Sequence, residues 1–431
     1  MVLAVFSPRT IKVADAALAR LVDLANAGRA RMKSLSPKLL IFLTVLVDLI
    51  GFGIIIPLLP SYGVKFGASG IQLGMLLAIH SAMQFIVSPM LGRLSDRVGR
   101  RPVLVISILG NVVAYSLLAT AGSLWMLFLA RFISGISAAN ITAAQAYLAD
   151  VTPREKRAGA MGLIGAAFGI GFVLGPALAG VMSHIDMAAP FWAATGLALV
   201  NLAWVALGLP ESLTPERRAE QMAQRAVGGA AWPAESRFPL LLVAYFLAVC
   251  GFSVMTTPLF PLYLTNRFGF DVSHVGYTFA MIGVIGALVQ GGVVRRIEPR
   301  VGSKKLASVG SILLIGSLLM LAVAQTLPAM LVWISGVALG NGLMQPALNT
   351  IASRFAYDHH QGRAMGFISS AGSLGRVLGP LISGALIVVS RPGAPVIDKS
   401  FGTTALFVAA GITGLSFLLL LAVPSDRSIR H

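Results

Sequence analysis

Four ionisable side chains lie inside otherwise apolar stretches of the chain: Asp48, His80, Arg131 and Arg376. Ionisable groups are costly in apolar surroundings and are functional candidates there. Among the 16 acidic residues, Asp48 alone lies deep in an apolar stretch, about ten residues from its start. A carboxyl group in that setting can bind and release a proton, which is the role we predict for Asp48. A structural role also stays open, in which Asp48 caps unwound backbone near Gly51 and Gly53.

Further polar side chains surround these four in the apolar stretches. His80 and Gln84 are four residues apart and share a face if helical, and His80 either titrates near neutral pH or packs between helices. Arg131 is expected to face an internal cavity, whereas for Arg376 ligand binding and pairing within the protein both stay open. Neutral hydrogen-bonding groups of the kind found in mixed polar and apolar pockets complete the predicted cavity: Asn140, Gln145, Gln290, Asn341 and Gln345.

The stretches that position these residues are typical of a membrane protein. Hydrophobic residues make up 56% of the chain and charged residues 11%, against roughly 25% charged in soluble domains. Lipid admits only helices or closed barrels, and the apolar runs are continuous and about 20 residues long, enough for a helix to cross the bilayer. We therefore predict an all-α polytopic membrane protein with twelve transmembrane helices, at 39–62, 71–92, 102–122, 124–149, 158–183, 190–209, 239–265, 273–294, 304–324, 327–351, 364–390 and 402–423.

The formal net charge of +17 could indicate nucleic-acid binding, but the placement of the basic residues favours a membrane protein with positively charged cytoplasmic loops. Of the 33 Lys and Arg residues, 27 lie in the two tails and in the loops after even-numbered helices, and four lie in the odd-numbered loops. This asymmetry predicts that both termini are cytoplasmic. The expected location is the bacterial inner membrane, and nucleic acid is not an expected partner.

The chain repeats itself. The tetrapeptides at 159–162 and 363–366 share "AMG", and "VLGP" occurs at 173–176 and 377–380, both at an offset of 204. Two similar six-helix bundles that rock about a shared site are typical of transporters. The predicted organisation is a basic N-terminal tail at 1–38, bundles at 39–209 and 239–423, a linker at 210–238 and a C-terminal tail at 424–431. Part of the N-terminal tail, with Leu18, Leu21, Val22 and Ala25, forms either an amphipathic surface helix or a disordered segment.

A dense charged motif, "GRLSDRVGRR" at 92–101, follows the second predicted helix. Gly92 and Gly99 permit a tight turn and close helix approach. Asp96 can accept at a helix N-terminus and pair with an Arg of the loop or of the other half, forming a charge latch in one conformation only. A plain positive-inside loop explains the arginines but not the acid or the glycines. The predicted latch comprises Gly92, Asp96, Arg97, Gly99, Arg100, Arg101 and Asp150.

Small residues recur along the fifth predicted helix, at Gly171, Gly175, Pro176 and Gly180. Small residues let helices pack closely in lipid. A tight contact of this kind could stop ions leaking between the two halves, although plain packing is the alternative. The repeat keeps the pattern at Gly375, Gly379, Pro380 and Gly384.

These motifs resemble those of the major facilitator superfamily. The 92–101 motif resembles its loop 2–3 signature, "LARFISG" with Arg131 its helix 4 signature, and "GFVLGPALAG" the helix 5 signature of its drug:proton antiporters. "LTVLVDLIGFGIIIPLLP" with Asp48, and "SAMQF" with Gln84, resemble the tetracycline-efflux branch. The resemblance implies a secondary transporter that exports small amphipathic compounds in exchange for protons, with a cavity lined by helices 1, 4, 7 and 10. The chain lacks the acids of that branch in helices 3 and 9, and Gly286 stands at its helix 8 His, so a metal–tetracycline cation is not the expected cargo.

Other classes of protein have less support. A proton symporter or facilitator that imports a nutrient uses the same fold and stays open. An enzyme is not expected, because the only dense candidate cluster, Asp358-His359-His360, lacks a metal-binding helical spacing. We expect a monomer with a small-molecule substrate, no metal and no cofactor other than the coupled proton. Cys250 is the single cysteine, so an intramolecular disulfide is excluded.

Overall fold

The computed structural model describes residues 36–138, 140–153, 156–213, 237–354, 361–387 and 400–423. In these ranges the ordered elements are all helices, and they form twelve membrane-length spans. The predicted N-terminal tail up to residue 35, the C-terminal tail and Asp358-His359-His360 lie outside the described residues. Most of the predicted linker, 214–236, does so as well.

The N-terminal half contains the first six spans. Five spans are single helices: α2 (Pro37–Lys65), α3 (Gly70–Val98), α4 (Arg100–Ala119), α7 (Arg157–Met182) and α8 (Ala189–Gly208). The fourth span comprises α5 (Leu124–Ser137) and α6 (Asn140–Asp150), with residue 139 between them outside the described residues. Local signals start two of these helices, since Ser36 caps α2 ahead of a proline and Ser69 forms a capping box with Gln72 on α3.

The C-terminal half contains the other six spans. Its first span joins α10 (Phe238–Val254), a kinked segment η2 (Met255–Leu259) in which Thr257 has extended backbone, and α11 (Phe260–Phe268). The second joins α12 (Val272–Leu288), the π-helical segment η3 (Val289–Val294) and α13 (Arg295–Val301). The remaining spans are α14 (Ser303–Val323), α15 (Leu327–Arg354), α16 (Gln361–Leu386) and α17 (Thr403–Ala422).

Eleven of the twelve spans are long and apolar enough to cross a membrane. The exception is the eleventh span, α16, which is 26 residues long but carries Ser369, Ser370, Ser373 and Arg376 along it. Leu374 and Leu378 lie on its exposed side. The helix is therefore two-faced, which explains why average hydropathy identifies it less clearly than its neighbours.

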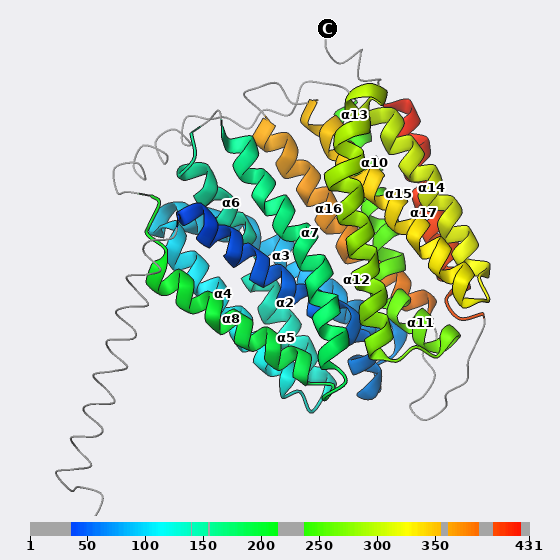
Figure 1. Ribbon diagram of the computed structural model, residues 1–431, viewed down its shortest axis with the longest axis horizontal. Helices are drawn as coiled ribbons and strands as arrows, with labels where there is room; N and C mark the ends of the chain where they lie inside the picture. The colour runs from blue at the N-terminus through cyan, green and yellow to red at the C-terminus, as the bar shows by residue number, and fades with distance from the viewer. Residues whose placement is uncertain are drawn as a thin grey trace, which may run out of the picture.

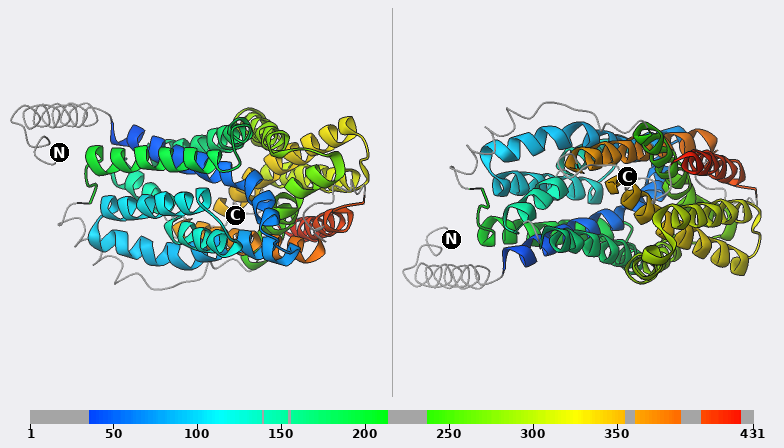
Figure 2. Two further views of the ribbon diagram at one scale, coloured as in Figure 1. Left: turned by 90° about the horizontal axis from the view of Figure 1, so that it is seen from below. Right: turned by 90° about the horizontal axis from the view of Figure 1, so that it is seen from above.

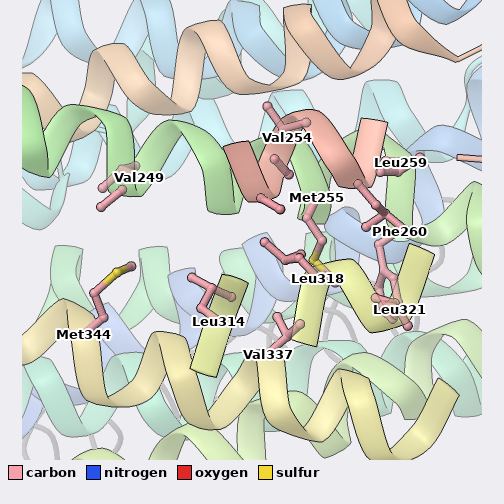
Figure 3. Close-up of a cluster of buried hydrophobic side chains, with 14 of the residues drawn as sticks. Val249, Val254, Met255, Leu259, Phe260, Leu314, Leu318, Leu321, Val337 and Met344 are labelled. Atoms are coloured by element: carbon pink, nitrogen blue, oxygen red, sulfur yellow. The ribbon is translucent and has the colours of Figure 1, made fainter. Parts of the chain in front are cut away.

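Each half is built around its own apolar interior. Figure 3 shows part of the interior of the C-terminal half, where Val249 of α10, Phe260 of α11, Leu318 of α14 and Met344 of α15 converge. The outer surface also carries large apolar side chains, and Leu288 is 67% exposed. Exposed apolar residues all around a helical bundle indicate lipid as the solvent. The chain is an integral multi-pass membrane protein.

The two halves lie side by side (Figure 1), and the views along the other axis show them as separate bundles (Figure 2). Two helix pairs make the main contacts between the halves: α3 with α16, and α7 with α12. Each pair joins the second span of one half to the fifth span of the other. This is the arrangement expected of two related bundles that meet across a pseudo-symmetric junction.

The orientation of this bundle can be tested by labelling the linker. We expect a cysteine introduced as Glu220→Cys to react with an impermeant maleimide only from the cytoplasmic face, because the positive residues place the linker there. The native Cys250 is 2% exposed and should stay silent. As a control, His184→Cys in the exposed turn after α7 should react only from outside. Labelling of residue 220 from outside would reverse the topology.

Candidate functional site

A cavity of about 930 Å³ opens between the halves, at the end of the molecule where α3 ends and α4 begins. We call this end, which carries residues 92–101, the basic end. The cavity walls come from α3, the start of α4, α6 and α7 of the N-terminal half and from α16 of the C-terminal half. Polar and aromatic groups alternate along the walls, at Gln84, Phe85, Ser88, Arg93, Asp96, Thr142, Gln145, Phe168, Phe367, Ser369, Ser370, Ser373 and Arg376.

At the opposite end, which we call the closed end, glycines bring the two halves into backbone contact. A methyl group added at Gly384 of α16 would meet the backbone of Gly70 and lie 2.9 Å from the Cα of Gly74, both on α3. A methyl group at Gly74 would meet the carbonyl oxygen of Pro380. Only glycine permits helices to approach this closely. The cavity therefore has one open end and one closed end.

The glycine motif of α7 serves two contacts. Gly171 and Gly175 face α2 of the same half, where an added methyl group would lie 2.6 Å from the Leu49 Cβ and from the Ile50 carbonyl oxygen, respectively. Gly180 faces α12 of the other half, and Gly276 on α12 would place a methyl group 2.7 Å from the carbonyl oxygen of Pro176. The predicted motif thus contributes both to packing within one half and to the contact between halves.

These contacts predict that Gly74→Ala disfavours the conformation with a closed end. Overpacking of this kind costs about 1–3 kcal/mol, which shifts an equilibrium between two conformations about 5- to 150-fold. We expect slower maleimide labelling of a cavity cysteine, Ser370→Cys, from the basic end. Gly316→Ala on α14, where the added methyl group meets nothing, is the control. Unchanged labelling of the Gly74→Ala protein would show that this contact does not hold the end closed.

Asp48 lies in the interior of the N-terminal half, 7% exposed, and is not on the cavity wall. The Asn140 amide of α6 donates to its Oδ2, and the Asn201 amide of α8 lies 3.4 Å from its Oδ1. Asn111 of α4 also hydrogen-bonds to the carboxyl group. The helix α2 is continuous past Asp48, so the alternative that Asp48 caps unwound backbone is excluded. A carboxyl group held by amides from three helices can bind and release a proton. Each change of its protonation state then alters its hydrogen bonds to all three helices.

His80 and Arg131 also lie inside the N-terminal half. The His80 Nδ1 is 2.9 Å from the hydroxyl of Ser134, and its ring centroid is 5.3 Å from that of Phe52. Arg131 is 3% exposed. The expectation that His80, Arg131 and Asn140 line the cavity is wrong for this conformation. His80 and Asn140 contact partners within their own half, and the Arg131 side chain is buried there.

The remaining predicted cavity residues divide into two groups. Gln84, Gln145 and Arg376 do line the cavity. Gln345 accepts a hydrogen bond from the Tyr245 hydroxyl at 3.4 Å inside the C-terminal half, and neither it nor Asn341 nor Gln290 is among the lining residues. Of the predicted lining helices 1, 4, 7 and 10, only helix 4 contributes to the cavity wall, through α6. Helices 7 and 10 supply no lining residue, and helix 1 is turned toward α7 by the contacts of Gly171 and Gly175.

The charged motif forms a buried cluster within the N-terminal half. Arg100 is 4% exposed, and its guanidinium contacts the Asp96 carboxylate at 2.6 Å and the Asp150 carboxylate at 3.0 Å. Its NH1 also donates to the Ser95 hydroxyl at 2.6 Å. The cluster joins α3, α4 and α6 while the cavity is open at the basic end. Arg97 is exposed, and Arg101 donates to the Ala206 carbonyl at the end of α8.

Two details of this motif differ from the sequence-based expectation. The helix α3 continues to Val98, so Gly92 lies within a helix and only Gly99, with φ of 110°, makes the turn. The acceptor at the start of α4 is not Asp96 but Glu211, whose carboxylate accepts from the backbone amides of Arg100 at 2.9 Å and Arg101 at 3.2 Å. Glu211 belongs to the predicted linker, and its "PES" context gave no sign of a contact with α4.

Three further residues of the site were not identified from sequence. Asn111 and Asn201, which surround Asp48, are isolated polar residues in apolar runs, a signal that would have found them. Ser370 was missed because a serine in a membrane helix is usually read as a small packing residue. Within the described residues no group of three or more His, Cys, Asp or Glu side chains is placed to hold a metal ion.

Two six-helix halves around a cavity that is open at one end define the class of secondary membrane transporters. The chain belongs to the Major Facilitator Superfamily, whose family model matches residues 41–380 and 299–430.

Curated relatives show the same family. The chain is 34% identical over 367 residues to the tetracycline resistance protein, class C, of Escherichia coli, covering 83% of this chain and 91% of that protein. It is 31% identical over 343 residues to multidrug resistance protein 1 of Bacillus subtilis, covering 79% and 87%, respectively.

A solved structure with a similar fold is the human organic anion transporter MFSD10, at a TM-score of 0.66 and 25% identity, covering 90% of this chain and 99% of that one.

Proposed function

We propose that this transporter works as a monomer and exports small amphipathic compounds by alternating access, in exchange for protons bound at Asp48. The observation that carries the proposal is the one-sided cavity, because a site open at one end and closed at the other by separable helix contacts is one of the two states that alternating access requires. The second state would separate the glycine contacts and close the basic end.

The charge distribution supports a cytoplasmic open end. Arg93, Arg97, Arg295, Arg296 and Arg300 all lie near the ends of α3 and α13, on the exposed surface. The positive-inside rule assigns such an end to the cytoplasm. The cavity then takes its cargo from the cytoplasm, and both termini are cytoplasmic.

The contact between Asp48 and Asn140 links proton binding to the cavity. Asn140 is the first residue of α6, and its amide donates to the Asp48 carboxyl group. Thr142 and Gln145, on the same short helix, line the cavity. A proton on Asp48 removes an acceptor from the Asn140 amide, so protonation changes how α6 is held and thereby the wall that cargo contacts. Cargo and proton then compete through one conformational equilibrium.

The walls suit an amphipathic cargo. Phe85, Phe168 and Phe367 offer apolar surface, while Gln84 and Gln145 offer hydrogen bonds. Pockets of this mixed character bind drug-sized molecules. The tetracycline and multidrug resistance proteins among the relatives also support export of such compounds.

Inverted membrane vesicles test the proposal. We expect an acidic lumen to drive uptake of a fluorescent amphipathic probe, and a protonophore to abolish it. A growth-inhibition panel with and without expression would select the probe. If the opposite gradient drives accumulation in the vesicles, the protein is a proton symporter that works as an importer in the cell; if neither gradient acts, it is a facilitator.

A further inference from the structure

We infer that the cavity binds organic anions, and that the guanidinium of Arg376 binds their acidic group. The inference rests on the proposed role of the cavity as the cargo site, and it adds the charge class of the cargo. It depends on three observations: the position of Arg376, the buried guanidinium of Arg131 without a counter-charge, and the pairing of the acid on the cavity wall.

Arg376 projects from α16 into the cavity, where its side chain is exposed to the cavity space. Its NH2 donates to the Ser373 hydroxyl at 3.1 Å. Within the described residues it has no carboxylate at ion-pair distance. A guanidinium has five N–H donors, so most of its donors face the cavity and can bind a planar anionic group in the paired geometry that Arg favours.

A second guanidinium group, that of Arg131, is buried in the N-terminal half. Arg131 is 3% exposed, and its Nε and NH1 lack hydrogen-bond partners within the described part of the chain. Both guanidinium groups lie within electrostatic range of the His80 ring. A buried cation without a counter-charge is costly, and a bound anion would supply that charge. The inner end of the cavity is thus electropositive.

The acid that the cavity wall contributes is already paired. Asp96 contacts Arg100 at 2.6 Å, and the two side chains are 8% and 4% exposed. Asp48 lies off the wall among amides. A cationic cargo therefore finds no available carboxylate along the described walls, whereas an anion finds Arg376 together with the hydroxyls of Ser369, Ser370 and Ser373.

The neighbouring groups indicate an organic anion rather than a small inorganic one. The cavity of about 930 Å³ is large for an inorganic ion. Phe367 and Phe168 provide apolar surface for a hydrocarbon body on facing walls, from α16 and α7 respectively. The expected ligand is an amphipathic carboxylate or sulfonate with its acidic group toward Arg376.

A matched pair of probes tests this inference on the purified full-length protein in nanodiscs. Dansylglycine is an anion at neutral pH, and dansylglycinamide is its neutral counterpart. We expect the protein to bind dansylglycine about tenfold more tightly, measured by the rise in dansyl fluorescence. Arg376→Gln should weaken dansylglycine binding roughly 10- to 100-fold, as loss of a charged hydrogen bond predicts, and change amide binding less than about twofold. Arg376→Lys should restore part of the preference.

Arg296→Gln is the control, because it removes the same charge from an exposed position on α13 that does not line the cavity. It should keep the preference for the anion. Equal or absent binding of the anion, or an equal loss of both probes in Arg376→Gln with an unchanged elution profile, would overturn the inference. Binding is measured without a pH gradient, so a failure of proton-driven export would leave this result interpretable on its own.

Discussion

Asp48→Asn should eliminate efflux driven by a pH gradient while leaving cargo binding and downhill exchange measurable. The asparagine amide cannot accept and release the coupled proton. It has the shape of the carboxyl group, and its oxygen can accept from one of the Asn140 and Asn201 amides while the other amide turns its oxygen toward the new NH2. Proteoliposomes with an imposed gradient would measure the uphill reaction, and counterflow of labelled cargo would measure exchange. Cargo affinity of the wild-type protein should fall as pH is lowered, and the variant should lose that dependence.

The exposed acid Asp186 supplies the control for this experiment, since Asp186→Asn removes an equal charge from the turn after α7. It should leave uphill efflux and its pH dependence intact. If Asp48→Asn still concentrates cargo with an unchanged pH profile, the coupling site lies elsewhere. His80 would be the next residue to substitute.

Arg100→Ala should remove most transport and also lower thermal stability. The substitution leaves the carboxylates of Asp96 and Asp150 buried without their counter-charge. Breaking a buried ion pair from one side costs about 3–5 kcal/mol. Transport is lost because α3, α4 and α6 are no longer held together when the basic end opens and closes. Thermal unfolding followed by size-exclusion chromatography would measure the stability, and cargo flux at low temperature the transport.

Arg100→Lys separates charge from geometry at this position. A lysine keeps the positive charge but cannot contact both carboxylates and Ser95 with a planar group. We expect it to recover much of the stability and only part of the transport. Arg296→Ala, an exposed arginine on α13, should match the wild type in both measurements. If Arg100→Ala has normal stability and normal flux, the motif is not a latch, and its arginines only set the orientation of the chain during membrane insertion.

The spans were predictable from sequence because a continuous apolar run about 20 residues long has one stable form in lipid. Their ends were less predictable. The second span continues to Val98 rather than 92, and the eighth to Val301 rather than 294. Hydropathy detects the hydrocarbon layer, whereas the helices continue beyond it with charged residues on their surfaces.

The site was predictable in part. The depth of Asp48 follows from its position along a helix of known rise. The direction of its side chain does not, because the contact of α2 with Gly171 and Gly175 decides which face of α2 turns inward. The charged motif indicated a latch. However, Glu211, which accepts from the backbone amide of Arg100, lies more than a hundred residues away in the chain. Such long-range pairs depend on tertiary packing, which cannot be predicted from the local pattern of a single sequence.

The cations at the starts of α4 and α14 have a consequence for how the chain is made. Arg101 donates to the carbonyl of Ala206 near the end of α8, and Lys304 donates to the carbonyl of Leu421 near the end of α17 at 2.8 Å. In each half the third span is thus fastened to the sixth, and the two spans between them must be synthesised before the partner exists. Until the sixth span emerges, water and lipid headgroups have to solvate that charge. Each half is therefore completed only by its last helix, and the first half can be complete before the second has left the ribosome.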